Sequence, residues 1–516
     1  MSADFILPRG GTSKRVAVRL SGKGLQTVRR KHPWIFEDSI EKLSAEAEPG
    51  DVAVVYDNRK IVAAGLVDPY SSIRVRLLTF GASKEVVGPG LFRLLAKQSA
   101  ERRNGLFGPE TNAFRLINGE SDGFPGLVAD KYADVLVMKV YTAAFIPHLG
   151  DVADALFEVY PCLKRLSLRF SREVSAMSAG LRRNLEDGML FSGDPAWNGQ
   201  VVFLENRLKF EADVRCGQKT GFFLDQRENR AKAGKLAAGV HSVLNVFSYS
   251  GGFSLYAAKN GARMVTDIDF NKHAIEASAH NFTLNGEIAN IAKCRHRGIA
   301  DDAFHAMNEL EKAGERFGIV IVDPPSFAKS LSERAQAMKS YSRLAVAAVR
   351  LLSKNGILVF ASCSSRIGAD ELFDEVHRAA ADAGRPLKEF DRRAEAPDHP
   401  ALFKESHYLK CLYAHICLFQ FSAGSLVDLI KHPVHDPELK AVAGKFAQLC
   451  KIFEIELACG VIIVSARLRR RFGKHGSRHD DMRIPPVHGL KCLRIDETQN
   501  RRRHSHADMI ARQQPA

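Results

Sequence analysis

Four short apolar runs in the second half of the chain constrain its fold most. They read VLNVF, RMVTDID, GIVIVD and GILVFAS, at 243–247, 263–269, 318–323 and 356–362. Helical stretches separate them, at 252–260, 271–284, 333–352 and 369–383. Short continuous apolar runs are typical of strands buried on both faces of a parallel sheet. Their alternation with helices predicts a doubly wound, Rossmann-like α/β sheet, and YLKCLYAHI at 408–416 supplies a plausible last strand.

Two smaller segments precede this sheet. Residues 14–85 are β-rich: 15–20 alternates as a strand does, 50–68 reads as a hairpin turning at Asp57-Asn58, and 72–80 closes the unit. Between them, Trp34 and Phe36 are expected to be core residues rather than rings that stack on a base.

Residues 90–190 read as a mixed α+β segment. It contains helices at 91–103 and 148–159 and strands at 134–141 and 163–169, with tight turns around FRLINGESDGFPGLVADKY. The predicted domains are therefore 14–85, 90–190 and 191–416, followed by a basic extension over 417–516. Charge runs in this extension favour a poorly ordered tail over an additional RNA contact.

Composition narrows the functional classes. The 516 residues suggest about three domains, and 45% apolar with 26% charged residues is ordinary for a globular protein. The net charge of +15 suggests either a polyanionic partner or a solvated basic surface. Nine cysteines without a CxxC pair indicate a reducing compartment. The N-terminus lacks a signal-peptide core and the apolar stretch at 458–466 is too short to span a bilayer, so we expect a cytoplasmic protein.

The segment NVFSYSGGF at 245–253 is a candidate ligand loop. Gly251 and Gly252 open a helix there, and a ligand can approach their backbone closely because no Cβ intervenes. Asp269 ends the next strand, where a carboxylate can accept hydrogen bonds from both ribose hydroxyls; the alternative is a helix N-cap. The absence of GxGxxG disfavours a dinucleotide oxidoreductase, so a nucleoside without phosphates, such as S-adenosylmethionine, fits better.

Two further acidic residues follow strands. Asp302 suits an acceptor for an adenine amino group, or is simply a surface acid. Asp323 begins DPPSFAKS, and the two prolines remove backbone donors and fix φ twice. This turn therefore holds Asp323 rigidly at the carboxyl edge of the sheet, where open α/β sheets bind ligands.

Cys363 follows the next strand, in SCSS at 362–365. Cytosine is a poor nucleophile at C5, but addition of a thiolate at C6 makes a nucleophilic enamine that attacks a methyl sulfonium. Such a role requires the thiol pKa to fall from about 8.5. The alternative is a buried structural cysteine, the commonest fate of a free thiol.

The stretch GQKTGFFLDQRENR at 217–230 precedes the sheet. Lys219, Arg227 and Arg230 are candidates for binding phosphate or RNA, and the pair Phe222-Phe223 for walling a cofactor site. The alternative is an amphipathic linker helix.

At these residues the chain resembles the bacterial large-subunit ribosomal RNA cytosine-C5 methyltransferases, over about residues 14–416. The resemblance rests on KHPWIF, GESDGFPGLVADKY, GQKTGFFLDQRENR, NVFSYSGGFS, DPPSFAKS, SCS, DHP and YLK, in this order. It implies a PUA domain that grips structured RNA, a central α+β domain and a class I methyltransferase domain.

The resemblance also implies residue roles. The S-adenosylmethionine-binding residues would be Phe247, Ser248, Ser250, Gly251, Gly252, Asp269, Asp302 and Asp323. Cys363 would be the nucleophile and Asp323 would orient or protonate cytosine near N3. RNA-contacting residues would be Lys31, Lys219, Arg227, Arg230 and Lys329. The expected partner is large-subunit ribosomal RNA, without a membrane or a metal, and a homodimer is left open.

The chain shares one feature with the family and departs from it at two places. Like the family, it has no cysteine after the DPP turn, where Ser326 stands, so the group that breaks down a covalent adduct is not identified. The hundred residues beyond 416 have no counterpart in the family, and DIDFNKHA lacks the small hydroxyl residue common after the acid. Two other functions are kept open: methylation of an exocyclic base nitrogen, with Phe327 stacking on the base, and a non-catalytic RNA-binding assembly factor.

Overall fold

The computed structural model describes residues 6–10, 14–82, 86–328, 330 and 332–417, together with two short strands at 456–458 and 461–463. Residues 1–420 form one compact unit and 421–516 a second. Within the second unit, β21 (Glu456–Ala458) and β22 (Val461–Ile463) pair antiparallel. The rest of the predicted extension, and Lys329, lie outside the described residues.

The N-terminal part folds into a six-stranded sheet in the order β2-β6-β5-β4-β1-β3. Its strands are β1 (Arg15–Leu20), β2 (Trp34–Phe36), β3 (Ile40–Leu43), β4 (Val52–Asp57), β5 (Lys60–Val67) and β6 (Ile73–Phe80), with α1 (Gly22–Arg29) after β1. The predicted hairpin is present as β4 and β5, and Asn58 in its turn has a φ of 53°. Asn tolerates this left-handed conformation better than most residues, which explains the turn.

The prediction that Trp34 and Phe36 are core residues is wrong for Phe36. Phe36 is 41% exposed and Trp34 is half-buried, whereas Ile35 between them is buried at 1%. Neighbouring residues of a strand point to opposite faces, so burying Ile35 turns both aromatic rings outward. The core-facing residue of β2 is therefore the aliphatic Ile35 and not the aromatic residues on either side of it.

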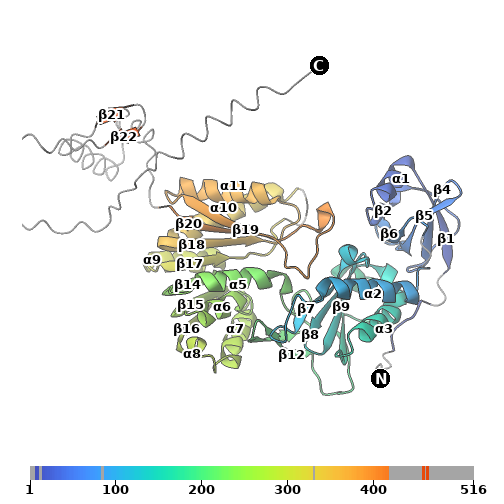
Figure 1. Ribbon diagram of the computed structural model, residues 1–516, viewed down its shortest axis with the longest axis horizontal. Coiled ribbons are helices and arrows are strands. Elements are labelled where there is room, and N and C mark those ends of the chain that lie inside the picture. Colours follow the sequence, from blue (N-terminus) through green and yellow to red (C-terminus); the bar gives the residue numbers. More distant parts are fainter. Residues whose placement is uncertain are drawn as a thin grey trace, which may run out of the picture. The chain divides into compact units, whose positions relative to one another are not determined.

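The central part is a five-stranded sheet in the order β11-β10-β9-β8-β7. Its strands are β7 (Ala113–Asn118), β8 (Leu127–Tyr132), β9 (Val135–Val140), β10 (Arg165–Phe170) and β11 (Met189–Phe191), with helices α2 (Pro89–Arg103), α3 (Leu149–Val159) and α4 (Arg172–Ser175). Helices α2 and α3 pack on one face of this sheet, and their apolar residues share one core with it. Figure 1 shows both helices lying along the strands.

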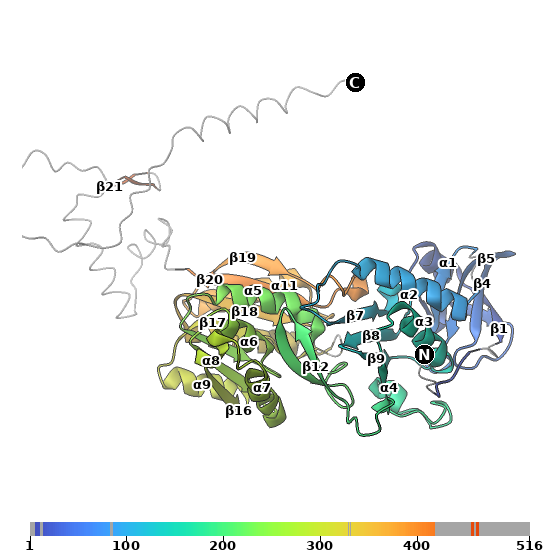
Figure 2. The same ribbon diagram turned by 60° about the horizontal axis from the view of Figure 1, so that its bottom comes forward.

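A hairpin that we did not predict joins the central sheet to the C-terminal one. Its strands β12 (Gln200–Glu205) and β13 (Leu208–Asp213) alternate buried and exposed residues. The buried side, with Phe203 and Phe210, shares a core with β8, β9 and Tyr256. Figure 2 shows β12 between the central strands and the helices of the larger sheet.

The largest sheet has seven strands in the order β16-β15-β14-β17-β18-β20-β19. They are β14 (Ser242–Val246), β15 (Met264–Asp269), β16 (Arg295–Ala300), β17 (Phe317–Val322), β18 (Leu352–Ser362), β19 (Leu387–Arg393) and β20 (Lys410–Ile416). The first five strands in this order run parallel, and β20 is antiparallel to both β18 and β19. The predicted fold class is confirmed. We did not predict β19, whose half-exposed residues lack the apolar run of a buried strand.

Helices cover both faces of this sheet. One face packs against α9 (Ala303–Lys312), α10 (Arg334–Leu351) and α11 (Ala369–Asp382), and the other against α5 (Arg227–Leu236) and α6 (Gly252–Lys259). The remaining helices are α7 (Lys272–Leu284) and α8 (Ala289–Lys293), and short 3-10 turns occur at Glu37–Ser39, Gly119–Asp122, Ala143–His148, Leu224–Gln226 and Lys404–Ser406. No helix in the described part of the chain is long and apolar enough to cross a membrane.

Candidate active site at the edge of the seven-stranded sheet

A cavity of about 340 Å³ opens at the carboxyl ends of β14, β15, β17 and β18. We call it the sheet-edge cavity. Its lining includes the loops that follow these four strands, with Phe247–Ser250, Asp269–Asn271, Asp323–Pro325 and Cys363. The segment 218–230 supplies a further wall through Gln218, Lys219, Phe222, Phe223, Asp225, Gln226 and Arg230. Together with Leu409, residues from six separate stretches of sequence thus meet where an open α/β sheet binds its ligands.

The loop after β14 is held in an unusual backbone conformation. Phe247 and Tyr249 have φ values of 62° and 48°, a region that costs most residues free energy. Two serine hydroxyls in this loop, Ser248 Oγ and Ser250 Oγ, are buried and have no hydrogen-bond partner. Both serines line the cavity. Buried polar atoms without partners are rare, so this loop is arranged to meet a polar ligand.

The glycines of this loop serve packing more than ligand approach. Gly251 has a φ of 73°, and a Cβ there would lie 1.9 Å from Ser278 Oγ. It is not among the cavity-lining residues, so its predicted direct role is not supported. Gly252 does line the cavity, and a Cβ there would lie 2.7 Å from Arg230 Cδ. Close packing and a left-handed turn therefore explain the glycine pair.

The two acids predicted to bind a nucleoside are placed differently. Asp269 lines the cavity; its Oδ2 accepts from the Tyr249 backbone N–H and its Oδ1 from that of Asn271, both at 2.9 Å. The N-cap of α7 is Asn271, so Asp269 is not the cap. Asp302 is exposed, caps α9 by accepting from His305 N–H at 3.0 Å, and lies outside the cavity lining. Its capping role corrects the predicted ligand contact.

Asp323 lines the cavity as an acid with an unusual pKa. Burial, reinforced by the nearby Asp225 carboxylate, raises the pKa of Asp323 to about 7. Gln226 Nε2 donates to Asp323 Oδ2 at 3.0 Å. At neutral pH the Asp323 carboxyl is therefore divided between its protonated and ionised forms, as a group that exchanges protons with a ligand requires.

A buried relay fixes the amide of Gln226. Gln226 Oε1 accepts from Asn229 Nδ2 at 2.6 Å, and Asn229 Oδ1 accepts from the Tyr413 hydroxyl at 3.2 Å. With its oxygen engaged by Asn229, the amide can present only its N–H groups to Asp323. The relay thus makes Gln226 a donor to Asp323.

Cys363 is half-buried and lines the same cavity as Asp323, one strand further along the sheet. Burial raises the pKa of the Cys363 thiol, and the nearby Lys219 ammonium opposes that rise. The low thiol pKa that nucleophilic attack needs is therefore not present in the protein alone. Cys363 nevertheless lines the cavity, unlike Cys411, which is fully buried within β20.

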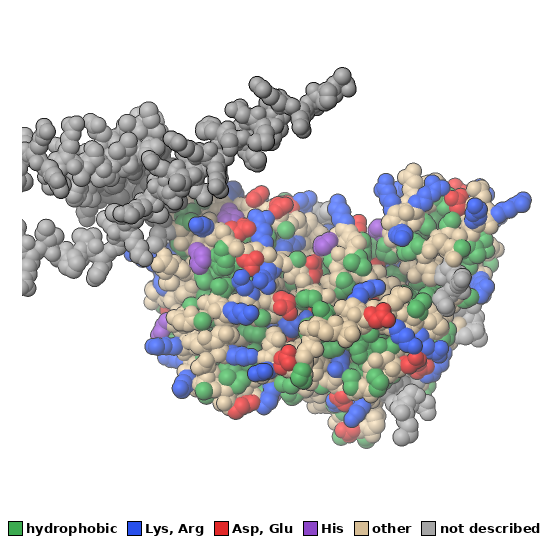
Figure 3. Space-filling model, in the orientation of Figure 1, with side chains coloured by type: hydrophobic (Ala, Val, Ile, Leu, Met, Phe, Trp, Pro, Cys, Tyr) green, Lys and Arg blue, Asp and Glu red, His purple; other side chains and the backbone are tan. Residues whose placement is uncertain are grey.

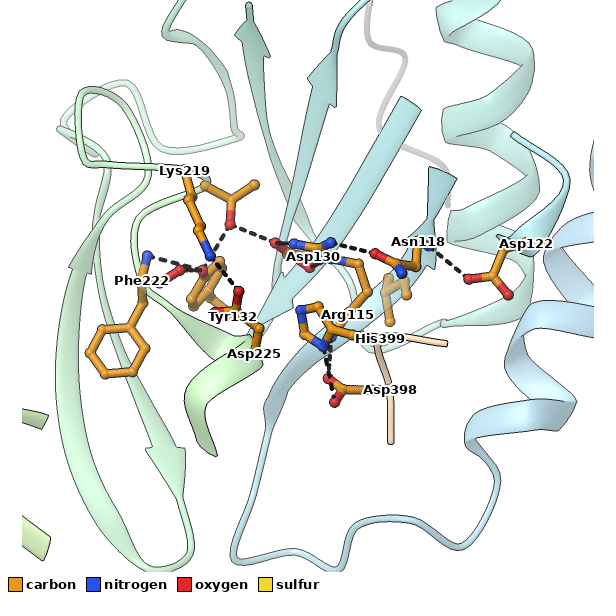
Figure 4. A network of polar contacts seen from close by, with 12 residues as sticks. Arg115, Asn118, Asp122, Asp130, Tyr132, Lys219, Phe222, Asp225, Asp398 and His399 are labelled. Carbon is orange, nitrogen blue, oxygen red and sulfur yellow. Dashed lines mark hydrogen bonds and ion pairs between the residues drawn. The ribbon is translucent and has the colours of Figure 1, made fainter. Parts of the chain in front are cut away.

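Lys219 and Asp225 form a charged pair beside the thiol. Lys219 Nζ donates to Asp225 Oδ2, which also accepts from the Tyr408 hydroxyl at 2.7 Å. Figure 4 shows Lys219 directed at Asp225. Burial favours the neutral acid, but the charges of Lys219 and His399 and these hydrogen bonds outweigh it, so the pKa of Asp225 is lowered. Asp225 therefore stays ionised at neutral pH, whereas its neighbour Asp323 is only partly ionised.

Comparison with known proteins identifies the family. Residues 182–413 match the family of S-adenosylmethionine-dependent methyltransferases, and residues 18–80 match a PUA-like domain. A ribosomal RNA large subunit methyltransferase of Deinococcus radiodurans is 42% identical over 408 residues, which are 78% of this chain and 98% of the relative. The ribosomal RNA large subunit methyltransferase I of Tolumonas auensis is 34% identical over 390 residues, covering 74% and 95%.

The chain belongs to the ribosomal RNA large subunit methyltransferase family.

Solved structures agree on the fold of this methyltransferase. A SAM-dependent methyltransferase from Streptococcus mutans superposes with a TM-score of 0.64 at 22% identity, covering 78% of this chain and all of the other. A second structure, a methyltransferase in complex with SAH, gives the same values.

The methyltransferase uses S-adenosylmethionine, and the sheet-edge cavity fits it. The unpartnered hydroxyls of Ser248 and Ser250 can donate to a polar ligand, and the Asp269 carboxylate suits ribose hydroxyls. Phe222 and Phe223, predicted to wall this site, both line it. Among the described residues no cluster of His, Cys, Asp or Glu could hold a metal ion.

Two arginines predicted to bind RNA serve the fold instead. Arg227 is 1% exposed and pairs with the buried Asp398, with its guanidinium 4.2 Å from the ring of Phe107. Arg230 is buried against Glu205 at 2.6 Å and lies over Phe222. Both guanidinium groups are thus held in place by buried carboxylates. The sequence DQRENR suggested RNA binding because the carboxylates that pair with its arginines, Asp398 and Glu205, are distant in sequence.

The other predicted RNA contacts are partly accessible. Lys31 is exposed and follows α1, and Lys219 is partly exposed at the rim of the sheet-edge cavity. On the face shown in Figure 3, Lys and Arg side chains are interspersed with Asp and Glu. Charge on this face therefore does not locate the RNA by itself.

Sequence reasoning missed Asp225, Gln226, Asn229 and Tyr408. The first three lie in the motif GQKTGFFLDQRENR, in which functional roles were predicted for the basic residues and the phenylalanine pair. A signal was present, because Asp225, Gln226 and Asn229 alternate with the basic residues where α5 begins. Tyr408 had no local signal, since its partner Asp225 is 183 residues away.

Proposed function

We propose that this methyltransferase forms 5-methylcytosine in large-subunit ribosomal RNA through a transient covalent bond to Cys363. The observation that carries the proposal is the pairing of a thiol and a carboxyl acid, Cys363 and Asp323, in one cavity at neighbouring strand tips. The names of the relatives support large-subunit ribosomal RNA as the substrate. Such a substrate also favours a cytoplasmic location.

Cys363 acts in this proposal as the nucleophile. Its thiolate forms an Sγ–C6 bond with cytosine, which makes C5 an enamine carbon able to take a methyl group. S-adenosylmethionine supplies that methyl group from a positively charged sulfonium. Loss of the C5 proton and departure of the thiolate from C6 then restore the aromatic base. Lys219 is a nearby cation that favours the thiolate during addition.

Asp323 acts as the acid at cytosine N3. Addition of a thiolate to C6 pushes electrons toward N3, where a neutral carboxyl can donate its proton. A pKa of about 7 supplies this neutral form at physiological pH without making the carboxylate too basic to lose the proton later. Gln226 is a positioning residue: its amide, fixed by Asn229, holds the Asp323 carboxyl in place.

The remaining roles follow from position. The loop Phe247–Ser250, Gly252 and Asp269 hold S-adenosylmethionine, and the PUA-like region, including Lys31, contacts RNA. The domains are residues 14–85, 90–190 and 191–416. The target base is flipped from its stack to reach Cys363, because a stacked C6 is not accessible to a thiolate.

Methylation of an exocyclic nitrogen is the competing chemistry, and one contact disfavours it. Phe327, which would stack on the base, lies 5.0 Å from the ring of the buried Tyr341 and is not among the residues lining the cavity. A non-catalytic assembly factor has no need for a raised pKa of Asp323 in a cavity that Cys363 also lines.

Nucleoside mass spectrometry of ribosomal RNA tests the proposal. Large-subunit RNA from cells lacking the protein is incubated with the purified protein and labelled S-adenosylmethionine, then digested to nucleosides. We expect label only in 5-methylcytidine. Label in a methylated guanosine or adenosine would establish the competing chemistry, and no label in any nucleoside would favour the assembly factor.

A further inference from the structure

A second cavity lies on the other side of Lys219 from the sheet-edge cavity. It has a volume of about 450 Å³, and we call it the junction cavity because all three large parts of the chain line it. Trp34 and Arg76 come from the six-stranded sheet, Arg115 and Tyr141 from the central part, and Phe403 and Tyr408 from the loop before β20. Cavities of this size hold small ligands.

The two cavities are separated by two short stretches of chain. Lys219 lines both of them, while its neighbour Thr220 lines the junction cavity. Likewise Tyr408 lines the junction cavity and Leu409 the sheet-edge cavity. A polymer held in one cavity can therefore continue into the other within a few bonds.

Arg76 gives the junction cavity a buried cation with an unsatisfied donor. Its side chain is 8% exposed, and its Nε has no hydrogen-bond partner. Burial lowers the pKa of Arg76, although Glu120, at 3.8 Å from its Nη1, opposes this. A buried N–H without a partner costs free energy that an oxygen of a ligand would recover.

Arg115 shows the contrast. Its guanidinium donates to Asp130 at 2.6 Å and to Asn118 at 2.6 Å, so it lies between two acceptors, as Figure 4 shows. Arg115 therefore shapes the cavity wall, and Arg76 is the arginine with a donor left for a ligand.

The aromatic residues of the junction cavity suit a base. The Trp34 indole is fixed by donating from Nε1 to Glu120 Oε1 at 2.9 Å, and its ring lies edge-on to Phe403 with centroids 5.6 Å apart. Tyr141 is 46% exposed at this cavity although it follows a buried strand. Exposed rings beside arginines are how proteins hold unpaired nucleotides.

We propose that the junction cavity binds an unpaired nucleotide of the RNA strand that flanks the nucleotide being modified. Its base packs on Trp34 and Tyr141, and Arg76 Nε donates to one of its oxygens. The modified nucleotide itself must reach Cys363, which lines the other cavity, so the junction cavity takes a neighbour. This inference rests on the proposed action on RNA and adds the site that sets the strand's position.

Cross-linking tests the site without requiring turnover. Large-subunit ribosomal RNA containing 4-thiouridine is irradiated with the full-length protein, and cross-linked peptides are identified by mass spectrometry. We expect cross-links to peptides containing Trp34 or Tyr141. Cross-links confined to other peptides would overturn the junction cavity as a nucleotide site, whether or not methylation occurs.

Kinetics of a matched pair of variants gives the second measurement. Tyr141→Ala is expected to raise the KM for RNA about tenfold, within the roughly 1–3 kcal/mol that stacking on one base contributes. Its kcat and its affinity for S-adenosylmethionine should stay unchanged. Tyr70→Ala, which removes an exposed tyrosine outside both cavities, is the control and should leave the KM unchanged.

The variants also separate the two proposals. An unchanged KM in both Tyr141→Ala and Trp34→Ala, in a protein that methylates RNA normally, would remove the junction cavity and leave the proposed function standing. Absence of methylation by the unaltered protein, with cross-links at Trp34 or Tyr141, would remove the proposed function and leave the nucleotide site.

Discussion

The two cavities of this methyltransferase are built in opposite ways. The sheet-edge cavity takes its chemical groups from turns directly after consecutive parallel strands, so Asp269, Asp323 and Cys363 are placed by one sheet. The junction cavity takes its groups from all three large parts of the chain, from Trp34 in the N-terminal part to Tyr408 in the loop before β20. Chemistry thus depends on a single rigid scaffold, whereas the proposed strand recognition depends on how neighbouring parts of the chain meet.

Asp225 and Asp323, two neighbouring acids of the sheet-edge cavity, have pKa values shifted in opposite directions. Asp225 is ionised because Lys219 and Tyr408 donate to it. Among the described residues, Asp323 has the Gln226 amide as its one side-chain donor and faces the charge of Asp225, and its pKa rises to about 7. Similar burial therefore shifts the two pKa values in opposite directions because the partners differ.

The largest expected effect comes from Cys363→Ala. We expect methyl transfer to fall by roughly 10⁴-fold or more, the scale found when an essential nucleophile is removed. Affinity for S-adenosylmethionine and for RNA should change little, which calorimetry and filter binding measure. Cys411→Ala, at a buried thiol outside the cavity, is the control for loss of a cysteine. Full activity of Cys363→Ala would show that the sheet edge does not supply the nucleophile.

Asp323→Asn is the next largest change. Loss of a general acid costs about 10² to 10⁴ in rate. In the unaltered protein kcat/KM should rise with pH as Cys363 ionises and should level off above about pH 7, because the loss of the Asp323 proton then offsets the gain in thiolate. The variant should lack this levelling off, so that its kcat/KM keeps rising until Cys363 is fully ionised. An identical pH profile in both proteins would contradict the role of Asp323.

Arg227→Ala tests the buried ion pair that Arg227 forms with Asp398. Asp398 would keep the hydrogen bond from the Arg115 backbone N–H but lose its guanidinium partner, and breaking a buried ion pair in this way costs about 3–5 kcal/mol of unfolding free energy. Denaturant unfolding measures the loss. Arg263→Ala, at an exposed arginine, should change stability by no more than about 0.5 kcal/mol. If Arg227→Ala kept full stability and weakened RNA binding alone, Arg227 would be an RNA contact after all.

Gln226→Met should have the smallest effect on rate, about tenfold. The hydrogen bond from Gln226 lowers the pKa of Asp323, so removing it moves the flat upper limb of the kcat/KM profile, which begins where Asp323 loses its proton, to higher pH. Gln218→Met, at a cavity-lining glutamine that is exposed and makes no such bond, should leave the profile in place. A purely structural Gln226 would slow the reaction without moving the limb.

The sequence predicted the sheet-edge cavity much better than the junction cavity. Apolar runs and stiff turns predicted the sheet and brought Asp269, Asp323 and Cys363 to one edge, because parallel strands share that edge. Arg227 and Asp302 were misplaced because an ion pair with Asp398 and a helix cap depend on tertiary neighbours. Nothing local marked Arg76 and Tyr408 as parts of one cavity, since they meet only when three parts of the chain pack together.

A covalent trap tests the central claim most directly. Ribosomal RNA in which cytidine is replaced by 5-fluorocytidine cannot lose a C5 proton after methylation, so the bond between Cys363 and C6 should persist. With S-adenosylmethionine present, we expect a protein–RNA adduct that survives denaturing electrophoresis and whose cross-linked peptide contains Cys363. Absence of that adduct from an enzyme that methylates unmodified RNA, or an adduct that persists in Cys363→Ala, would contradict the account.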